Sequence, residues 1–371
     1  DKAQNRFRQV QEFSRSLLFD VHDALTPVPG AMGARVLLLN RATQFLDGLS
    51  ADAGSDDALK AELAEGYRRL GRLQGSSIEA GGIGDTAAAK LSLEQAARLA
   101  EEAIAARPDA VDRLTLNMRI QYQAEQNLRR RGEFAAADGP HARLLALAEQ
   151  TLRRFPDDAD AQLGAAEAYS NLGVGRTGRK DDDGALAYYE QSLRLFDRLP
   201  AALLGQDETV RLHAMALRRM GALSWVKMRL APAEAYYRKA LALQDDALAR
   251  DPANAAKRLE LHTTLGDLGG VLNQGGRVDE AITLWTRGLA IAEEARAADP
   301  VNLGAADAVA LIRARIGEAA REAGRHDEAV THLRAVVALR DASARRLGSA
   351  PDAIGERAYA RLYLARALLD A

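Results

Sequence analysis

Three glycines followed by two cations form the part of this sequence that most closely approaches a nucleotide-binding motif. Gly173, Gly175 and Gly178 fit the GxGxxG spacing with which a strand-to-helix turn cradles a pyrophosphate. A phosphate-binding P-loop also needs Lys followed by Ser or Thr, and Arg179 and Lys180 stand there instead. The three glycines end a helical pattern and do not follow a strand pattern. We therefore interpret them as a helix end and expect no nucleotide cofactor.

The adjoining residues match part of a calcium-binding loop. Asp181, Asp183, Gly184 and Glu190 have the spacing of the middle and end of an EF-hand loop, but its first ligand position holds Arg179. A guanidinium cannot replace a carboxylate ligand, whereas Asp residues at the start of a helix complement the helix dipole. We expect a helix N-terminus here and no metal site.

No other pattern predicts catalysis or a cofactor. The six His residues form no HExxH motif and no pair four residues apart, and the absence of Cys removes thiolate nucleophiles and Cys-based zinc sites. Hydrolase and kinase motifs are also missing. The basic run Arg129–Arg131 ends a helix, where cations are favourable, and a small anion site is the alternative reading. We expect no catalytic residue, and an unrecognised hydrolase is the weakest of three candidate functions.

Composition limits the partners of the chain. Its 371 residues carry 50 Lys and Arg against 52 Asp and Glu, a formal charge of -2, which argues against nonspecific nucleic-acid binding. Hydrophobic residues make up 47% and aromatic residues only 5%, which favours helix over strand. No apolar run approaches the roughly 20 residues of a membrane span. Because the sequence begins at Asp1, we expect a processed product or excised segment, joined to a membrane only through a span outside it.

A repeat of 48 residues organises the sequence. One column is always Ala, a second column four residues later is mostly bulky, and a third, twelve residues before the Ala, is Gly in the last four units. Turn signals precede the Ala, and Pro recurs after it, although Pro200 and Pro351 fall out of phase. The Ala column comprises Ala89, Ala137, Ala185, Ala233, Ala281 and Ala329; the bulky column comprises Leu93, His141, Tyr189, Tyr237, Trp285 and Leu333; the Gly column comprises Gly173, Gly221, Gly269 and Gly317. Each unit predicts a helix, a tight turn, a second helix and a Pro stop.

This spacing resembles the tetratricopeptide repeat. The match is clearest in Leu217, Met220, Gly221, Ala233, Tyr237 and Ala240. A standard unit of that family has 34 residues, so each unit here has 14 more, about two extra turns in each helix. We predict an all-α, right-handed superhelical solenoid of long helical hairpins. Its expected parts are an N-terminal hairpin at 1–55, with helices Phe7–Leu25 and Ala34–Leu49, six repeats at 56–352, and a capping helix at 353–371. A glycine-rich loop is expected at Gln74–Asp85.

A solenoid of this kind offers a concave groove that is formed mainly by the first helix of each hairpin and suits a peptide or protein ligand. Positions three before, one after and four after the Gly column should face it. The candidate groove residues are Tyr122, Gln126, Arg129, Arg218, Trp225, Asn273 and Arg321. Arginines and an aromatic ring suit an acidic or carboxylate-bearing peptide, with the alternative that the neighbouring hairpin covers Trp225. Homodimerisation is a further expectation.

The first 90 residues resemble a narrower family, namely the segment that follows the transmembrane helix in bacterial receptor-like serine/threonine protein kinases of the Pkn type. The resemblance covers Arg6–Ala89 and rests on Phe19, His22, Asp23, Pro29, Gly30, Ala34, Arg35, Leu46, Asp47, Leu49, Gly75, Gly84 and Asp85. It implies a periplasmic sensor region without catalytic residues, controlling a cytoplasmic kinase whose output can include an extracytoplasmic-function sigma factor. The sequence SSIEAGGIGD departs from the usual loop of that family, which puts any ligand of this loop in doubt. A cytoplasmic repeat scaffold or peptide-responsive regulator is the alternative.

Overall fold

The computed structural model describes residues 32–76, 82–298, 303–347 and 351–371, and all regular secondary structure in these ranges is helical. This confirms the predicted all-α fold class. The predicted helix Phe7–Leu25 lies outside the described residues. None of the described helices is both long and apolar enough to cross a membrane.

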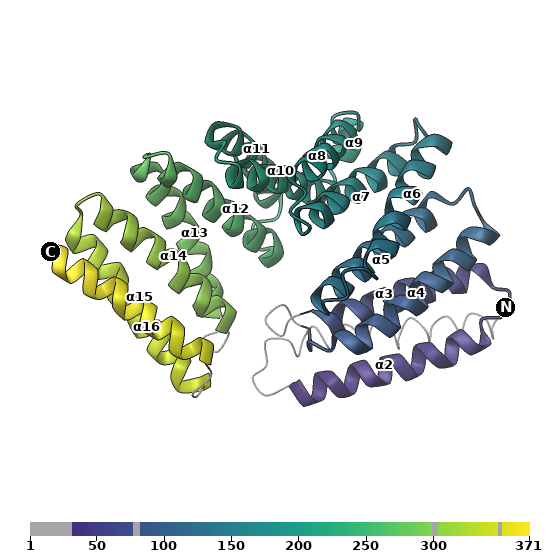
Figure 1. The fold of residues 1–371 in the computed structure, drawn as a ribbon, viewed down its shortest axis with the longest axis horizontal. Coiled ribbons are helices and arrows are strands. Elements are labelled where there is room, and N and C mark those ends of the chain that lie inside the picture. The colour runs from purple at the N-terminus through teal and green to yellow at the C-terminus, as the bar shows by residue number, and fades with distance from the viewer. Residues whose placement is uncertain (1–31, 77–81, 299–302, 348–350) are drawn as a thin grey trace. The chain divides into compact units, whose positions relative to one another are not determined.

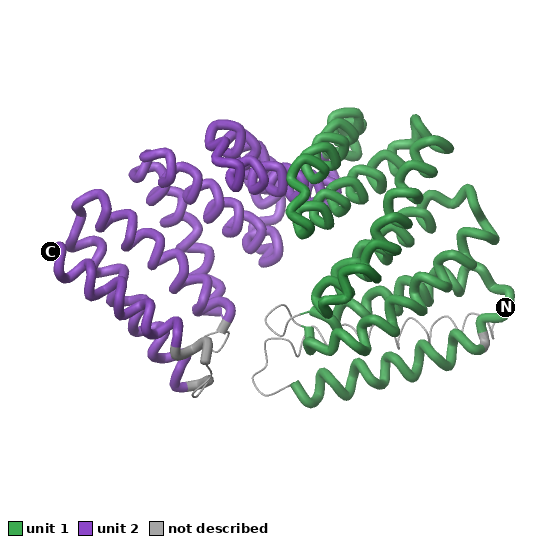
Figure 2. Tube along the Cα trace, in the orientation of Figure 1, with its two compact units in different colours: residues 1–204 green, residues 205–371 purple. Residues whose placement is uncertain are grey.

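The helices form two compact units, residues 1–204 and residues 205–371 (Figure 2). The first unit contains α2 (Met32–Asp52), α3 (Asp57–Gly75), α4 (Thr86–Ala106), α5 (Val111–Arg130), α6 (Asp138–Arg154), α7 (Ala159–Thr177), α8 (Asp182–Phe196) and α9 (Ala201–Leu204). The second contains α10 (Asp207–Val226), α11 (Leu230–Arg250), α12 (Ala255–Gln274), α13 (Val278–Ala298), α14 (Leu303–Glu322), α15 (His326–Leu347) and α16 (Pro351–Asp370).

Neighbouring helices pair as hairpins within each unit (Figure 1). The pairs are α3 with α4, α5 with α6, α7 with α8, α10 with α11, α12 with α13 and α14 with α15, while α2 packs on α3 and α16 on α15. The paired helices run from 15 residues in α8 to 22 in α15. Each unit is therefore a tetratricopeptide-like stack of long helical hairpins, as the repeat predicted.

The columns of the repeat mark the place where the two helices of a hairpin cross. All six residues of the Ala column are fully buried at 0% exposure. A Cβ atom on Gly173 or Gly269 would lie within 3.0 Å of the ring of Tyr189 or Trp285, which such atoms essentially never do. The first helix therefore needs glycine where the second helix presents its ring.

The departures of the chain from the repeat have local causes. Helix α8 ends early, at Phe196, and the one-turn helix α9 fills the rest of the unit behind Pro200, so that α10 still begins 48 residues after α7. Helix α3 continues to Gly75, so the expected loop Gln74–Asp85 starts two residues later than predicted. Its residues 77–81 lie outside the described part of the chain.

Six hairpin turns place one residue each in the left-handed region, always 48 residues apart. Four of these residues are glycines with φ between 74° and 79°: Gly84, Gly132, Gly276 and Gly324. The other two are Lys180 with φ 60° and Met228 with φ 58°. In five of the turns the next residue donates its N–H to the carbonyl five positions earlier, as Asp181 does to Arg176 at 3.0 Å. This hydrogen bond is typical of a Schellman helix end, which favours glycine.

Replacing Lys180 by glycine should stabilise the protein by about 0.5–1 kcal/mol, because glycine adopts this backbone conformation without steric cost. Lys180 is exposed, so little packing is lost. Chemical denaturation of Lys180→Gly and of the control Lys180→Ala measures the effect, since Ala retains the strain. Equal stability of the two variants would contradict the explanation.

Candidate functional site: a charged substitute for the glycine–aromatic contact

One hairpin of the first unit replaces the glycine–aromatic contact with charged groups. Glu125 on α5 stands 48 residues before Gly173, in the Gly column, and His141 on α6 stands 48 residues before Tyr189. Both are buried, with 0% of Glu125 and 7% of His141 exposed. The place filled by a ring against glycine in α7 and α8 thus holds a carboxylate and an imidazole.

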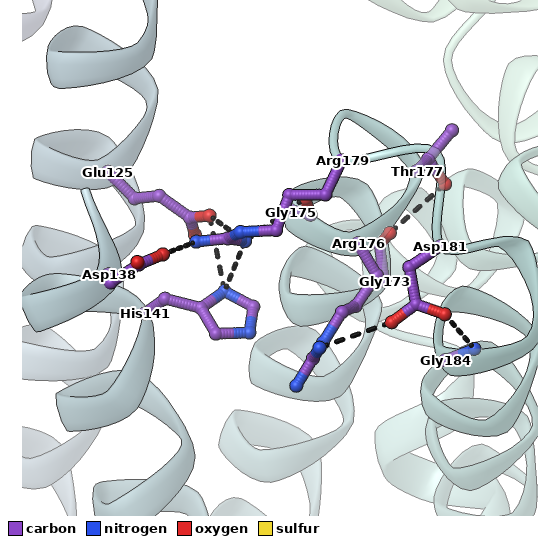
Figure 3. A network of polar contacts seen from close by, with 10 residues as sticks. All are labelled: Glu125, Asp138, His141, Gly173, Gly175, Arg176, Thr177, Arg179, Asp181 and Gly184. Atoms are coloured by element: carbon purple, nitrogen blue, oxygen red, sulfur yellow. Dashed lines mark hydrogen bonds and ion pairs between the residues drawn. The ribbon is translucent and has the colours of Figure 1, made fainter. Parts of the chain in front are cut away.

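Arg179, in the turn after α7, completes this cluster from the next hairpin (Figure 3). The Glu125 Oε1 atom lies 3.1 Å from His141 Nδ1 and 3.1 Å from Arg179 Nη1. The other guanidinium nitrogen, Nη2, lies 2.6 Å from Oδ1 of the exposed Asp138. We call these four residues the charged slot: Glu125, Asp138, His141 and Arg179.

One glycine of the GxGxxG sequence, Gly175, leaves room for the charged slot, and another, Gly178, leaves room for Arg129. A Cβ atom on Gly175 would lie 2.5 Å from Glu125 Oε1 and 2.8 Å from His141 Nδ1. A Cβ atom on Gly178 would collide with the guanidinium of Arg129. Gly173 packs against Tyr189, and α7 ends at Thr177 with Gly178 as its C-cap, which confirms that the motif lies at the end of a helix.

The carboxylates nearby also have structural roles. Asp181 caps α8 by accepting a hydrogen bond of 3.0 Å from the Gly184 N–H, as expected for a helix N-terminus. Its carboxylate also lies 3.1 Å from Arg176, whose guanidinium lies over the Tyr188 ring. The Arg179 guanidinium lowers the pKa of Asp138, so that carboxylate stays ionised near neutral pH. The described residues contain no group of three His, Asp or Glu placed to hold a metal.

The charged slot joins two hairpins through contacts of His141 and Arg179. His141 contacts a carboxylate, a guanidinium and the Tyr188 ring, and no Ser or Thr is among its described contacts. Among the described residues, Glu125 Oε2 and His141 Nε2 are buried without a hydrogen-bond partner. The slot is best explained as a structural connection between α5 and α6, the two helices of one hairpin, and the end of α7.

The predicted groove residues lie on first helices, as the repeat register requires. Tyr122, Gln126 and Arg129 lie on α5, and Arg129 lies over the Phe134 ring at 5.7 Å. The second unit holds the remaining four, Arg218 and Trp225 on α10, Asn273 on α12 and Arg321 on α14.

Three of these side chains contact the next first helix, 49 residues further along the chain. Arg218 lies 2.9 Å from Asp267, and Arg321 lies 3.0 Å from Asp370. The indole N–H of Trp225 donates a hydrogen bond to Gln274. Trp225 is only partly buried, and Gly270 of the neighbouring hairpin covers part of its ring. The side chains proposed for a ligand thus also hold successive first helices together.

The sequence did not predict that Glu125, His141 and Arg179 contact one another. His141 was expected to be a packed residue of the bulky column, and the structure confirms its burial. The missed signal is Glu125, because a charged residue in a glycine column requires a partner. Arg179 cannot be identified as that partner from spacing alone, since it reaches back 54 residues to the preceding hairpin.

Comparison with known proteins supports the fold alone. No family model and no curated protein matches the chain. Three solved structures with 12–17% sequence identity resemble it. BtubC (BKLC) from P. vanneervenii is 17% identical over 68% of this chain and 90% of its own, with a TM-score of 0.55. The apo form of RapI is 12% identical over 85% and 74%, with a TM-score of 0.55. Aspartyl phosphate phosphatase F from Bacillus subtilis is 13% identical over 96% and 82%, with a TM-score of 0.50.

Removing the guanidinium of the charged slot should be costly. In Arg179→Met the buried Glu125 carboxylate loses its cation, and we expect a loss of about 2 kcal/mol or more in the free energy of unfolding. Arg194→Met, which removes an exposed pair with Glu190, should change it by less than about 0.5 kcal/mol.

A rescue variant tests the same interpretation. Adding Glu125→Gly and His141→Tyr to Arg179→Met recreates the contact of the neighbouring repeat and should restore most of the lost stability. Denaturant titration of the three proteins measures this. A triple variant no more stable than Arg179→Met would show that the slot is not a substitute for the glycine–aromatic contact.

Proposed function

We propose that this chain is a non-catalytic, protein-binding repeat region that holds a peptide or protein segment along the first helices of its hairpins. The observation that carries the proposal is the distribution of exposed apolar side chains in the second unit. Among the residues that the structure describes in this unit, the exposed large hydrophobic ones are Val226, Met228, Leu259, Leu311, Tyr359, Leu362, Leu368 and Leu369. Apart from Met228 in a turn, all lie on α10, α12, α14 or α16.

The second helices of this unit differ from the first helices in the side chains that they expose. Among their described residues, α11, α13 and α15 expose no large hydrophobic side chain. A soluble repeat protein has no stability reason to expose apolar groups on one set of helices, whereas a binding face does. Leu311 and Tyr359 are 50% and 65% exposed and occupy the same repeat position, 48 residues apart.

Charged pairs accompany these apolar groups on the same helices. Arg218 with Asp267 and Arg321 with Asp370 are partly exposed pairs on first helices and α16. A carboxylate of the ligand can take the place of the aspartate that pairs with either arginine, because arginine binds carboxylates through several N–H groups. Apolar anchors flanked by arginines therefore support an acidic segment with large apolar residues as the ligand.

We further propose that this chain is the sensor region of a longer protein. The resemblance of Arg6–Ala89 to the segment after the membrane helix of Pkn-type kinases supports a periplasmic sensor that controls a cytoplasmic serine/threonine kinase. Ligand binding, or dimerisation of the repeat region, would then change how two kinase domains meet. A ligand can do this only through different affinities for the two arrangements. An extracytoplasmic-function sigma factor is the proposed substrate class.

Selection of peptides against the full 371-residue chain tests the binding face. Leu311→Ser and Tyr359→Ser should each raise the dissociation constant of a selected peptide by about tenfold or more, because exposed anchors supply most of the binding energy. Lys239→Ser, at an exposed position of the second helix α11, is the control and should leave the dissociation constant unchanged. The proposed face would be refuted by peptides whose dissociation constant is unchanged in both first-helix variants, or changes only in Lys239→Ser.

A separate experiment tests the proposed link to a kinase. Deleting residues 1–371 from the full-length protein should leave a kinase that binds ATP but no longer responds to its stimulus, and a reporter fused after Ala371 should be extracytoplasmic. A reporter in the cytoplasm, or normal switching without these residues, would favour the cytoplasmic scaffold.

A further inference from the structure

A pocket of about 290 Å³ lies in the first unit, where α4 meets α5 and the start of α6. Its walls are mostly apolar and are formed by Leu93, Ala97, Ala124, Leu128, Ala136 and Pro140. The volume is close to the lower end of the range of pockets that hold small organic ligands, about 300–1,000 Å³. The pocket is therefore large enough for a compact ring compound.

The pocket lies where α6 begins late. Helices α4 and α8 begin at Thr86 and Asp182, and the 48-residue repeat places the corresponding start of α6 at Phe134. Helix α6 begins about one helical turn later, at Asp138, and residues 134–137 form turns. Ala136 and Pro140, on either side of the actual start, line the space that the missing turn leaves.

A chain of hydrogen bonds ends at this pocket. Arg143 on α6 donates to both carboxylate oxygens of Glu101, at 2.7 Å and 2.6 Å. Asn117 Nδ2 donates to Glu101 Oε1 at 2.7 Å, and Gln121 Nε2, one turn further along α5, donates to Asn117 Oδ1 at 3.0 Å. Burial opposes ionisation of Glu101, but the hydrogen bonds from Arg143 and Asn117 lower its pKa overall, so the carboxylate can only accept near neutral pH. Glu101 therefore fixes the orientation of both amides.

The Gln121 side chain leaves its carbonyl oxygen for the pocket. Gln121 lines the pocket and is only 7% exposed. Its Nε2 atom is bound to Asn117, and no described residue donates a hydrogen bond to its Oε1 atom. The other amide of the lining, Asn127, donates to the Thr86 carbonyl at 3.0 Å, and its own oxygen is buried against Gly75. An acceptor without a donor in a buried side chain costs free energy, which a ligand with an N–H or O–H group would recover.

The charged groups of the lining favour a neutral ligand. Lys90 is paired with Glu133, with 2.9 Å between Nζ and Oε2. Glu94 is exposed to solvent, where a carboxylate needs no partner. A charged ligand would lose its hydration on entering the pocket and would find no buried counter-charge among the described lining residues.

We infer that this pocket binds a small neutral aromatic compound that carries one N–H or O–H donor, such as an indole or a phenol. The donor would bind Gln121 Oε1, and the ring would pack against Leu93, Leu128 and Pro140. The ligand would contact α4 and α5 together and so stabilise the packing of one hairpin on the next. A free compound and a Trp or Tyr side chain of a bound protein share this chemistry. The inference does not depend on the proposed binding face of the second unit.

An NMR titration of the full chain, read by saturation transfer, tests the hydrogen bond. It compares indole with 1-methylindole, which has the same ring system without the N–H donor. We expect the dissociation constant of indole to be about fivefold lower, because only indole can donate to Gln121. In Gln121→Met, which keeps the length of the side chain but has no carbonyl, the two compounds should bind equally.

A third compound, N-acetyltryptophanamide, distinguishes the two sources of the ligand. It should bind at least as tightly as indole if the pocket receives a protein side chain, and more weakly if it receives a free compound. Both results agree with the inference, provided that indole binds more tightly than 1-methylindole.

A second variant tests the pocket without altering Gln121. Ala97→Leu enlarges a partly buried side chain of the wall and should raise the dissociation constants of both compounds by about tenfold or more. Ala146→Leu, at an exposed site of α6 outside the pocket, should leave them unchanged. Four results would each overturn the inference: equal binding of indole and 1-methylindole to the unaltered chain, an unchanged preference in Gln121→Met, unchanged binding in Ala97→Leu, or no saturation transfer from indole at about 1 mM.

Discussion

The close crossing of the two helices in each hairpin is the constraint on which the rest of this structure depends. The crossing requires an alanine that is fully buried on the second helix and, in most hairpins, a glycine on the first helix to accept a bulky side chain. Because these positions are tied to one another, the repeat length stays at 48 residues even where α8 is shortened and α9 makes up the difference. Long helices then bring the same faces together in hairpin after hairpin.

The charged slot shows how far this constraint can be altered. Glu125 removes the glycine and His141 the large ring, and the buried carboxylate is tolerated because Arg179 and His141 both approach the same oxygen. Burying a carboxylate without such partners would cost several kcal/mol. Gly175 must remain small so that these side chains can meet. A sequence that looks like a nucleotide-binding motif is therefore a consequence of helix packing.

The sequence predicted what repeats locally and missed what connects one repeat with another. The Ala, Gly and bulky columns were sufficient to predict hairpins, turns and helix ends, whereas the left-handed conformation of Lys180 and Met228 is seen only in the structure. The contacts of Arg179 with Glu125 and of Trp225 with Gln274 could not be predicted, since they depend on how adjacent hairpins pack.

A fully buried alanine at each helix crossing sets the geometry of the hairpin. The most direct test compares Ala281→Phe with Ala290→Phe, because both residues lie on α13 but Ala281 is 0% exposed and Ala290 is at the surface. Overpacking of the crossing predicts that Ala281→Phe loses about 1–3 kcal/mol in the free energy of unfolding while Ala290→Phe loses little. Equal unfolding free energies for the two variants, measured by denaturant titration, would contradict it.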